Sequence, residues 1–325
     1  MKTTIKGVLV GVLAVAMLAG APAALAQGYP ARPVKLVIGF GPGTGSDILG
    51  RLLGIKLAEG LGQSVVVENK PGAGGIIGSD AVAKSAPDGY TVLLGTNAML
   101  ITSPLLATSA PYEVTRDFTP VGGVARTSMV MVTGVTPASP KTLADIIALS
   151  KSGKQNFASA GAGTIGHLTT EVVVRKMGLQ VAHIAYKGSG QSLNDVSRGE
   201  VLFASDTPVA ALPLIRSGRL RAIAVTGESR FPSLPDTPTF IESGVTDVKL
   251  YAWWGLFVPV GTPADVVRKL DQTLAKVVAD PDTRKRMAGM EMEPFSMPAD
   301  KLAAFVKTEF PFWQQFLAQA GIKLN

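Results

Sequence analysis

The feature that most constrains the fold is the stretch of residues 34–47, which reads VKLVIGFGPGTGSD. Residues 34–40 form a short apolar run bounded by turn residues, which is typical of a buried strand in a parallel sheet. The glycines that follow allow a sharp turn in which the backbone can approach a ligand without an intervening Cβ. Ser46 or Asp47 suits the N-cap of a helix that begins near Ile48. The stretch therefore predicts a strand, a glycine-rich turn and a helix.

The predicted helix start is also a candidate anion site. The N-terminus of a helix offers free N–H groups and a partial positive charge. Ligands of open α/β sheets gather at the carboxyl ends of the strands, where this turn lies. Any α/β fold needs glycines in a tight turn of this kind, so the residues favour ligand contact and plain turn geometry about equally.

Two further units of the same kind follow along the chain. Residues 64–67 (SVVV) predict a second strand, which leads into the glycine-rich loop 68–75 and a helix over 76–85. Residues 90–94 (YTVLL) predict a third strand, with Thr96 at its carboxyl end. Three such units in succession predict a parallel, doubly wound sheet whose loops meet at one edge.

The succession of strand–loop–helix units is interrupted in residues 118–132, which hold two short β-like runs. A second set of α/β units follows up to residue 225. The remainder contains an irregular proline-rich connector, a strand over 253–258 and an amphipathic helix over 264–279. A last helix begins at Lys301, and Pro311 is expected to break or kink it. The two sets of units predict paired α/β lobes.

The N-terminus reads as a signal peptide. Lys2 and Lys6 precede a thirteen-residue apolar run over 8–20, and Ala24 and Ala26 form a small-residue cleavage signal. We expect cleavage after Ala26. The alternative is a membrane anchor, for which the run is short. The absence of cysteine excludes an acylated lipoprotein, disulfides and thiolate metal sites.

The charge of the chain favours small anions over nucleic acid. The first 26 residues carry two lysines and no acids, so their removal lowers the formal net charge from +7 to +5. This surplus is spread along the sequence without a dense basic block, which disfavours nucleic-acid binding. With 46% hydrophobic and 17% charged residues, the composition is that of a soluble globular protein.

Residues 161–166 (GAGTIG) match the dinucleotide pattern G-x-G-x-x-G after a short predicted strand. A dinucleotide site would also require a carboxylate near residue 186, where the chain reads Tyr186-Lys187-Gly188. Nucleotide binding is therefore disfavoured. The loop, flanked by Ser159 and Thr164, can instead hold a carboxylate or simply allow a helix and a strand to pack closely.

The remaining candidates each have a structural explanation. His167 and His183 are the only histidines, and both suit a structural role better than a metal site. Asp47 and Asp206 are candidate catalytic carboxylates, but such residues are more often helix caps. Lys187 could meet an anion or remain solvated. Of the adjacent Trp253 and Trp254, we expect one to face the core, and the other is a candidate for lining a cleft.

Nine motifs, taken in order, resemble one known family. They are residues 29–33 (YPARP), 40–47, 68–75 (ENKPGAGG), 86–91 (APDGYT), 117–121 (DFTPV), 159–168, 186–188, 234–239 (LPDTPT) and 253–263. With this order and spacing the chain resembles the Bug-type (TctC-like) periplasmic receptors of tripartite tricarboxylate transporters. The resemblance covers essentially the whole chain after residue 26.

The resemblance implies an α/β, two-lobed periplasmic-binding-protein fold of type II-like architecture. Each lobe is expected to be a mostly parallel sheet flanked by helices, with the ligand in the cleft between them. The expected organisation is a signal peptide over 1–26, a discontinuous first lobe of residues 27–125 and 225–325, and a second lobe of residues 126–224.

The resemblance also implies that a ligand carboxylate is held by the first strand–helix loop and by the glycine loop of the second lobe. Carried onto this chain, the expected ligand-binding residues are Phe40, Gly43, Thr44, Gly45, Ser46, Asp47, Thr96, Ser159, Gly161, Ala162, Gly163, Thr164, His167, Lys187, Gly188 and Asp206. Thr44 stands where relatives commonly have glycine. No catalytic residue, metal or cofactor is expected.

The expected function is a monomeric periplasmic receptor that captures a small organic carboxylate and hands it to a membrane permease. The ligand class includes mono-, di- and tricarboxylates and aromatic acids, and the tryptophan pair suggests a ring or an apolar body. One alternative is a carboxylate sensor that acts on a signalling partner. Another is an exported hydrolase using Asp47 or Asp206 with His167.

Overall fold

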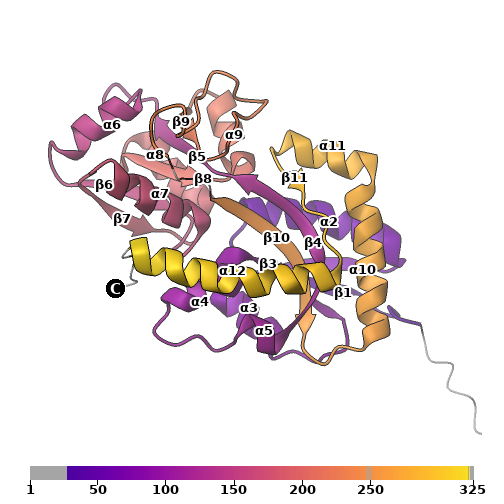
Figure 1. Cartoon of the computed structure of the whole chain (residues 1–325). Helices are drawn as coiled ribbons and strands as arrows, with labels where there is room; N and C mark the ends of the chain where they lie inside the picture. Colours follow the sequence, from indigo (N-terminus) through magenta and orange to yellow (C-terminus); the bar gives the residue numbers. More distant parts are fainter. Residues whose placement is uncertain (1–27, 247, 249, 321, 323–325) are drawn as a thin grey trace, which may run out of the picture.

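The chain forms two α/β lobes, each built on one sheet (Figure 1). The structure is a computed structural model that describes residues 28–246, 248, 250–320 and 322, so the predicted signal peptide lies outside the described residues. The strand order is β11-β4-β10-β3-β1-β2 in the first sheet and β7-β6-β8-β5-β9 in the second. Within the described ranges, no helix has the length and apolar character needed to cross a bilayer.

The first lobe begins with the three predicted strand–loop–helix units. β1 (Val34–Ile38) lies between β2 (Val65–Asn69) and β3 (Thr91–Thr96) and is parallel to both. β10 (Tyr251–Pro259) is inserted antiparallel between β3 and β4 (Phe118–Ser128), and the short β11 (Glu293–Pro294) closes the edge. The centre of this sheet is thus completed from the far end of the sequence.

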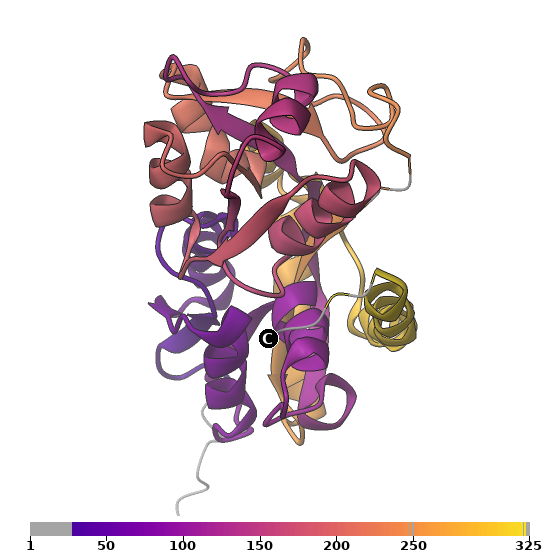
Figure 2. The same cartoon turned by 90° about the vertical axis from the view of Figure 1, so that its left-hand side faces the viewer.

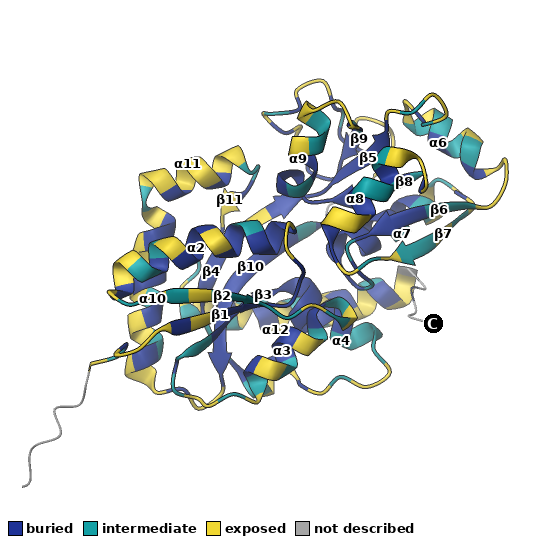
Figure 3. Ribbon diagram, turned by 180° about the vertical axis from the view of Figure 1, so that it is seen from behind, coloured by how far each residue is buried: buried dark blue, intermediate teal, exposed yellow. Residues whose placement is uncertain are grey.

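Helices cover both faces of the first sheet. On one face α2 (Gly45–Leu61) packs against α10 (Ala264–Ala279), and on the other lies the long α12 (Ala299–Ala320) (Figures 1 and 3). The other helices of the lobe are η1 (Ala73–Gly75), α3 (Ile76–Ala83), η2 (Ala98–Thr102), α4 (Ser103–Leu106), α5 (Val114–Asp117) and α11 (Pro281–Gly289). The expected break at Pro311 is absent: α12 runs on through this residue, with Trp313 buried against the core.

The second lobe carries the predicted second α/β set and stands above the first in Figure 2. β6 (Gln155–Ser159) is parallel to β7 (Val181–Ala185) and β8 (Phe203–Asp206), whereas β5 (Val130–Gly134) is antiparallel to β8 and to β9 (Leu220–Val225). Its helices are α6 (Leu143–Ser150), α7 (Ile165–Lys176), α8 (Ser189–Arg198) and α9 (Pro208–Arg216).

The two-lobed α/β fold is confirmed, but both sheets are mixed rather than mostly parallel. Every antiparallel pair in them involves β4, β5 or β10. These are strands through which the chain passes from one lobe to the other or returns. Their direction depends on how the lobes are joined. The local strand–loop–helix pattern carries no information about this.

The two crossings between the lobes lie side by side. Met129 separates β4 from β5, and Thr226 directly follows β9. The Met129 N–H donates to Thr226 Oγ1, and the Thr226 N–H donates to the Met129 carbonyl, both over 2.9 Å. The Thr226 hydroxyl in turn donates to the carbonyl of Leu250, where the chain re-enters the first lobe. All connections between the lobes therefore meet at one hydrogen-bonded point.

Candidate functional site

A cavity of about 480 Å³, counting its opening to solvent, lies between the lobes. The first lobe contributes the loop after β1, the end of β3 and part of β10, and the second contributes the loop after β6, the start of α8 and the end of β8. The lining residues are Phe40, Thr44, Gly45, Ser46, Thr96, Asn97, Ala98, Met129, Ala160, Thr164, Ile165, Gly166, Ser189, Ser205, Asp206, Thr207, Ala252 and Trp254.

Thr44 forms the wall of the first lobe as the N-cap of α2. Its Oγ1 accepts a hydrogen bond from the Asp47 N–H over 3.3 Å and donates to the Gly41 carbonyl over 2.9 Å. Gly43 has a φ of 78°, and its N–H donates to the Asp47 carboxylate over 3.0 Å. The expected cap at Ser46 or Asp47 is thus wrong by two or three positions, because the Thr44 hydroxyl closes the turn.

Thr164 forms the wall of the second lobe with the same geometry. As the N-cap of α7, its Oγ1 accepts from the His167 N–H over 3.3 Å and donates to the Gly161 carbonyl over 2.8 Å. Gly163 has a φ of 77°, and its N–H donates to His167 Nδ1 over 3.1 Å. Each lobe therefore presents the same pattern, G-x-G-T with an acceptor three residues after the threonine, at a helix start.

These two helix starts make the cavity attractive to an anion without a cationic side chain. The first N–H groups of a helix have no partner within the helix and carry partial positive charge. Among the described residues, Asp206 is the only charged side chain in the lining, and no lysine, arginine or histidine contributes to it. A bound anion would accordingly be held by backbone N–H groups and hydroxyls.

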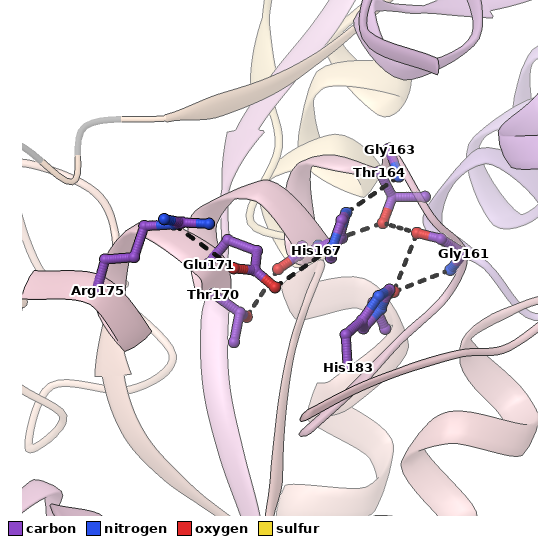
Figure 4. A network of polar contacts seen from close by, with 10 residues as sticks. Gly161, Gly163, Thr164, His167, Thr170, Glu171, Arg175 and His183 are labelled. Carbon is purple, nitrogen blue, oxygen red and sulfur yellow. Dashed lines mark hydrogen bonds and ion pairs between the residues drawn. The ribbon is translucent and has the colours of Figure 1, made fainter. Parts of the chain in front are cut away.

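A buried polar network supports the second loop from behind (Figure 4). Ser159 Oγ lies 2.7 Å from His183 Nε2, and the rings of His183 and His167 are stacked with centroids 3.9 Å apart. Burial and the neighbouring His167 lower the pKa of His183 to about 4. His167, whose Nε2 lies 3.7 Å from Glu171 Oε1, lowers the pKa of Glu171. Both histidines thus have partners, and neither lines the cavity.

The structure brings only part of the predicted set to the cavity wall. Seven of the sequence-predicted residues line it: Phe40, Thr44, Gly45, Ser46, Thr96, Thr164 and Asp206. Gly43, Asp47, Ser159, Gly163 and His167 shape the two loops from outside the lining. Gly161, Ala162 and Lys187 line an adjoining cavity that shares Phe40 and Ala160 with the first. Gly188 faces Gly41 and Thr44.

Sequence reasoning did not select ten residues of the lining. They include Asn97, Ala98, Met129, Ala160, Ile165, Gly166, Ser189, Ser205, Thr207 and Ala252. A usable signal existed for Asn97, Ser205 and Thr207, because each is next to a predicted residue at the carboxyl end of a strand. Met129 and Ala252 carry no local signal, since only the meeting of the two lobes places them here.

Residues 49–322 match the sequence model of a family described as "Tripartite tricarboxylate transporter family receptor". The chain belongs to this family. Among its relatives, the protein BugT of Bordetella pertussis is 34% identical over 307 residues, which are 92% of this chain and 93% of BugT. A protein encoded in the tcbD–tcbE intergenic region of Pseudomonas sp. strain P51 is 33% identical over 91% of this chain and 89% of its own.

Solved structures of receptors share the two-lobed fold. The periplasmic binding protein BugD has a TM-score of 0.86 at 35% identity, covering 91% of this chain and 99% of BugD. An R. palustris protein solved with adipate has a TM-score of 0.86 at 32% identity, with the same coverage. MatC from Rhodopseudomonas palustris with bound malate has a TM-score of 0.83 at 29% identity, covering 89% and 100%. The family consists of solute-binding receptors, not enzymes.

The geometry of this receptor also lacks the acid–base pair that the hydrolase alternative required. Among the described residues, no hydrogen bond or ion pair joins His167 to Asp47 or Asp206. Asp47 instead binds Arg51 over 2.9 Å and accepts from Asn69 over 3.0 Å. In the same part of the chain, no cluster of three or more histidine or acidic side chains is arranged to hold a metal ion.

The side chains of the two adjacent tryptophans lie on opposite faces of β10. Trp254 lines the cavity, and its indole N–H donates to Ser46 Oγ over 2.8 Å. Trp253 packs against Phe305, and its N–H donates to Glu309 over 3.1 Å. Both rings are buried, but only Trp254 is part of the cavity wall among the described residues.

Asp206 is the one charged group that the receptor places in the cavity wall. Its Oδ1 accepts a hydrogen bond from the Thr207 N–H over 2.7 Å, whereas its Oδ2 has no hydrogen-bond partner among the described residues. Burial raises the pKa of Asp206 to about 6, although the polar groups of Ser189 and Thr207 favour the charged form. The Ser189 hydroxyl lies near the carboxylate without forming a hydrogen bond.

Proposed function

We propose that this receptor captures a small organic carboxylate in the periplasm and delivers it to a membrane transporter of the tripartite tricarboxylate type. One observation carries the proposal: two helix starts with the same G-x-G-T turn, one from each lobe, line a single cavity. A carboxylate between them accepts hydrogen bonds from both lobes at once. The relatives solved with adipate and malate support the ligand class.

The proposed contacts are strong enough without a salt bridge. Each hydrogen bond to a charged group contributes roughly 1.5–3 kcal/mol. Four or five of them, less the entropy lost on capture, correspond to about −8 kcal/mol and a dissociation constant of the order of 1 μM. An arginine in the cavity is therefore unnecessary.

The contacts between the lobes support capture by closure. An added Cβ at Gly45 would lie 2.7 Å from the Thr207 hydroxyl oxygen, so the first lobe approaches β8 closely beside the cavity. At the other side the Thr102 hydroxyl donates to the Gly163 carbonyl over 2.6 Å. A ligand that touches both lobes stabilises this closed arrangement, and the paired crossings at Met129 and Thr226 are the natural hinge.

The proposal includes the cellular setting predicted from the sequence. Residues 1–26 direct export and are removed after Ala26, the mature receptor acts as a monomer, and its macromolecular partner is the transporter's membrane permease. Retention of the protein in the cytoplasm with residues 1–26 intact would contradict this setting, and cell fractionation followed by N-terminal sequencing tests it.

A carboxylate screen tests the binding function directly. The melting temperature of residues 27–325 is measured with mono-, di- and tricarboxylates, aromatic acids and matched uncharged amides. A true ligand at 100 times its dissociation constant stabilises the fold by about 2.7 kcal/mol and raises the melting temperature. Titration calorimetry then gives a dissociation constant near micromolar, with the ligand recovered unchanged. A screen in which no acid at millimolar concentration shifts melting more than its amide would overturn the proposal.

A further inference from the structure

The two helix starts leave one feature of the cavity unexplained, namely the carboxylate of Asp206. This residue lies at the end of β8 and is only 5% exposed. Thr207 holds Oδ1, but Oδ2 has no partner among the described residues. An anion held by the helix starts would share its cavity with this negative group.

The Ser189 hydroxyl beside Asp206 also lacks a hydrogen-bond partner in the described parts of the chain. Ser189 is the first residue of α8, is buried and lines the cavity. Its polar group favours the charged form of the Asp206 carboxylate, so the two lie close together. One wall of the cavity therefore holds two polar groups that lack partners.

No cationic side chain among the described residues lines this wall. On α7, His167 and Arg175 are both paired with Glu171, and on α2, Arg51 is paired with Asp47. On α8, Arg198 contacts Asp195. Among the described residues no ion pair involves Asp206. A buried carboxylate without a cation is unfavourable unless a bound group compensates it.

An ammonium group is the chemical complement of Asp206 and Ser189. It carries a positive charge and three N–H donors, enough for Asp206 Oδ2, the Ser189 hydroxyl and one further acceptor. A second carboxylate at the same place would add repulsion between like charges in a low dielectric. The wall thus distinguishes ligands by the group that accompanies their carboxylate.

We propose that the ligand is an amino acid in its zwitterionic form, an inference that rests on the proposed function. Its carboxylate lies between the starts of α2 and α7, and its ammonium group binds Asp206 with Ser189. Asp206 is then the residue that selects an amino carboxylate over a plain acid of the same shape.

Calorimetry with matched ligand series tests this assignment. The series are succinate, L-malate and L-aspartate, then glutarate and L-glutamate, and finally butyrate and 4-aminobutyrate. In at least one series the wild type is expected to bind the amino member ten times or more tightly than the member that lacks the ammonium. The assignment is overturned if the plain acid binds as tightly as the amino member, or more tightly, in every series. It is also overturned if only the four-carbon diacid series binds and malate has the same affinity as aspartate.

Asp206→Asn identifies the residue responsible. The variant is expected to lose at least tenfold in affinity for the amino ligand while its affinity for the plain acid stays within about threefold or improves. Asp236→Asn, an exposed position in the proline-rich connector, makes the same charge change away from the cavity and should alter neither. Equal losses for both ligands in Asp206→Asn overturn the assignment. The proposed function fails separately, when no acid in the wider carboxylate screen described above binds.

Discussion

The indole N–H of Trp254 donates a hydrogen bond to the Ser46 hydroxyl over 2.8 Å, joining residues that are 208 positions apart in the sequence. Both side chains are buried and both line the cavity. The contact ties β10 to the first turn of α2, where the ligand carboxylate is proposed to bind. A strand from the C-terminal part of the chain thereby holds one of the two helix starts in place.

Trp254→Phe is expected to weaken carboxylate binding by about fivefold to tenfold. The variant keeps an aromatic ring but leaves the Ser46 hydroxyl without its donor, a loss of roughly 1 kcal/mol or more. Calorimetry measures the affinity and a thermal melt the stability. Trp253→Phe is the matched control, because its indole N–H binds Glu309 on the other face of β10. If both variants bind the acid equally well, the contact with Ser46 does not support the site.

Thr44→Val and Thr164→Val are each expected to lower both stability and affinity. Valine keeps the shape of threonine but loses the cap and the bond to the glycine carbonyl, which costs about 1 kcal/mol of stability. Without the cap the turn is no longer fixed, and affinity for the acid should fall at least tenfold. Thr44→Ser and Thr164→Ser retain the hydroxyl and should bind nearly as the wild type does. Serine variants as weak as the valine variants would contradict a capping role.

Asp206→Asn is expected to stabilise the ligand-free protein at alkaline pH. Burial raises the pKa of Asp206 from 3.8 to about 6, so the folded state takes up a proton before the unfolded state does. The wild type therefore gains stability as pH falls from above 6 to about 4, whereas the asparagine variant has no such gain. The variant should be the more stable at pH 8, by an amount of the order of 3 kcal/mol, and the advantage should vanish near pH 4.

Melting temperatures of both proteins between pH 4 and 8, with Asp236→Asn alongside, measure this difference. An advantage that is constant across the pH range would argue against the titration of Asp206. If Asp206→Asn is less stable than the wild type at pH 8, the carboxylate stabilises the fold instead of being a destabilising group kept for ligand binding.

His183→Gln is expected to protect the fold in mild acid. Burial and His167 lower the pKa of His183 from 6.5 to about 4, so the unfolded state takes up the proton first and the wild type loses stability as pH falls through this interval. Glutamine does not titrate and can still bond to Ser159. The difference in melting temperature, variant minus wild type, should therefore rise between pH 7 and pH 4. A difference independent of pH would contradict the neutral histidine.

Much of the architecture could be predicted because it is written in local patterns. Apolar runs next to glycine-containing turns located β1, β2 and β3, and the two glycine-rich loops, together with the family resemblance, pointed to Thr44 and Thr164. The mixed sheets could not be predicted in this way, because the direction of β5 and β10 is set by how the chain travels between the lobes. The cap of α2 was misplaced for a smaller reason, since several neighbouring side chains can satisfy the same N–H groups.

The cavity lining was harder to predict than the loops that frame it. Lys187 follows β7 by two residues, close to where it was expected, yet it lines the adjoining cavity, which shares Phe40 and Ala160 with the first. Ser189 looked like an ordinary turn residue, and only its position beside Asp206 gives it a chemical role. The choice between Trp253 and Trp254 required the register of β10 against β3 and β4.

The central place of β10 has a consequence for biosynthesis. A chain made from its N-terminus can complete the second sheet once residue 225 has emerged, but β3 and β4 wait for residues 251–259 before they can join. Until then both strands have an open edge, and such edges pair readily with other chains. The first lobe, which begins the sequence, is thus the last to fold. A chain that ends before residue 251, through truncation or a stalled ribosome, would have a complete second lobe attached to an incomplete, aggregation-prone first lobe.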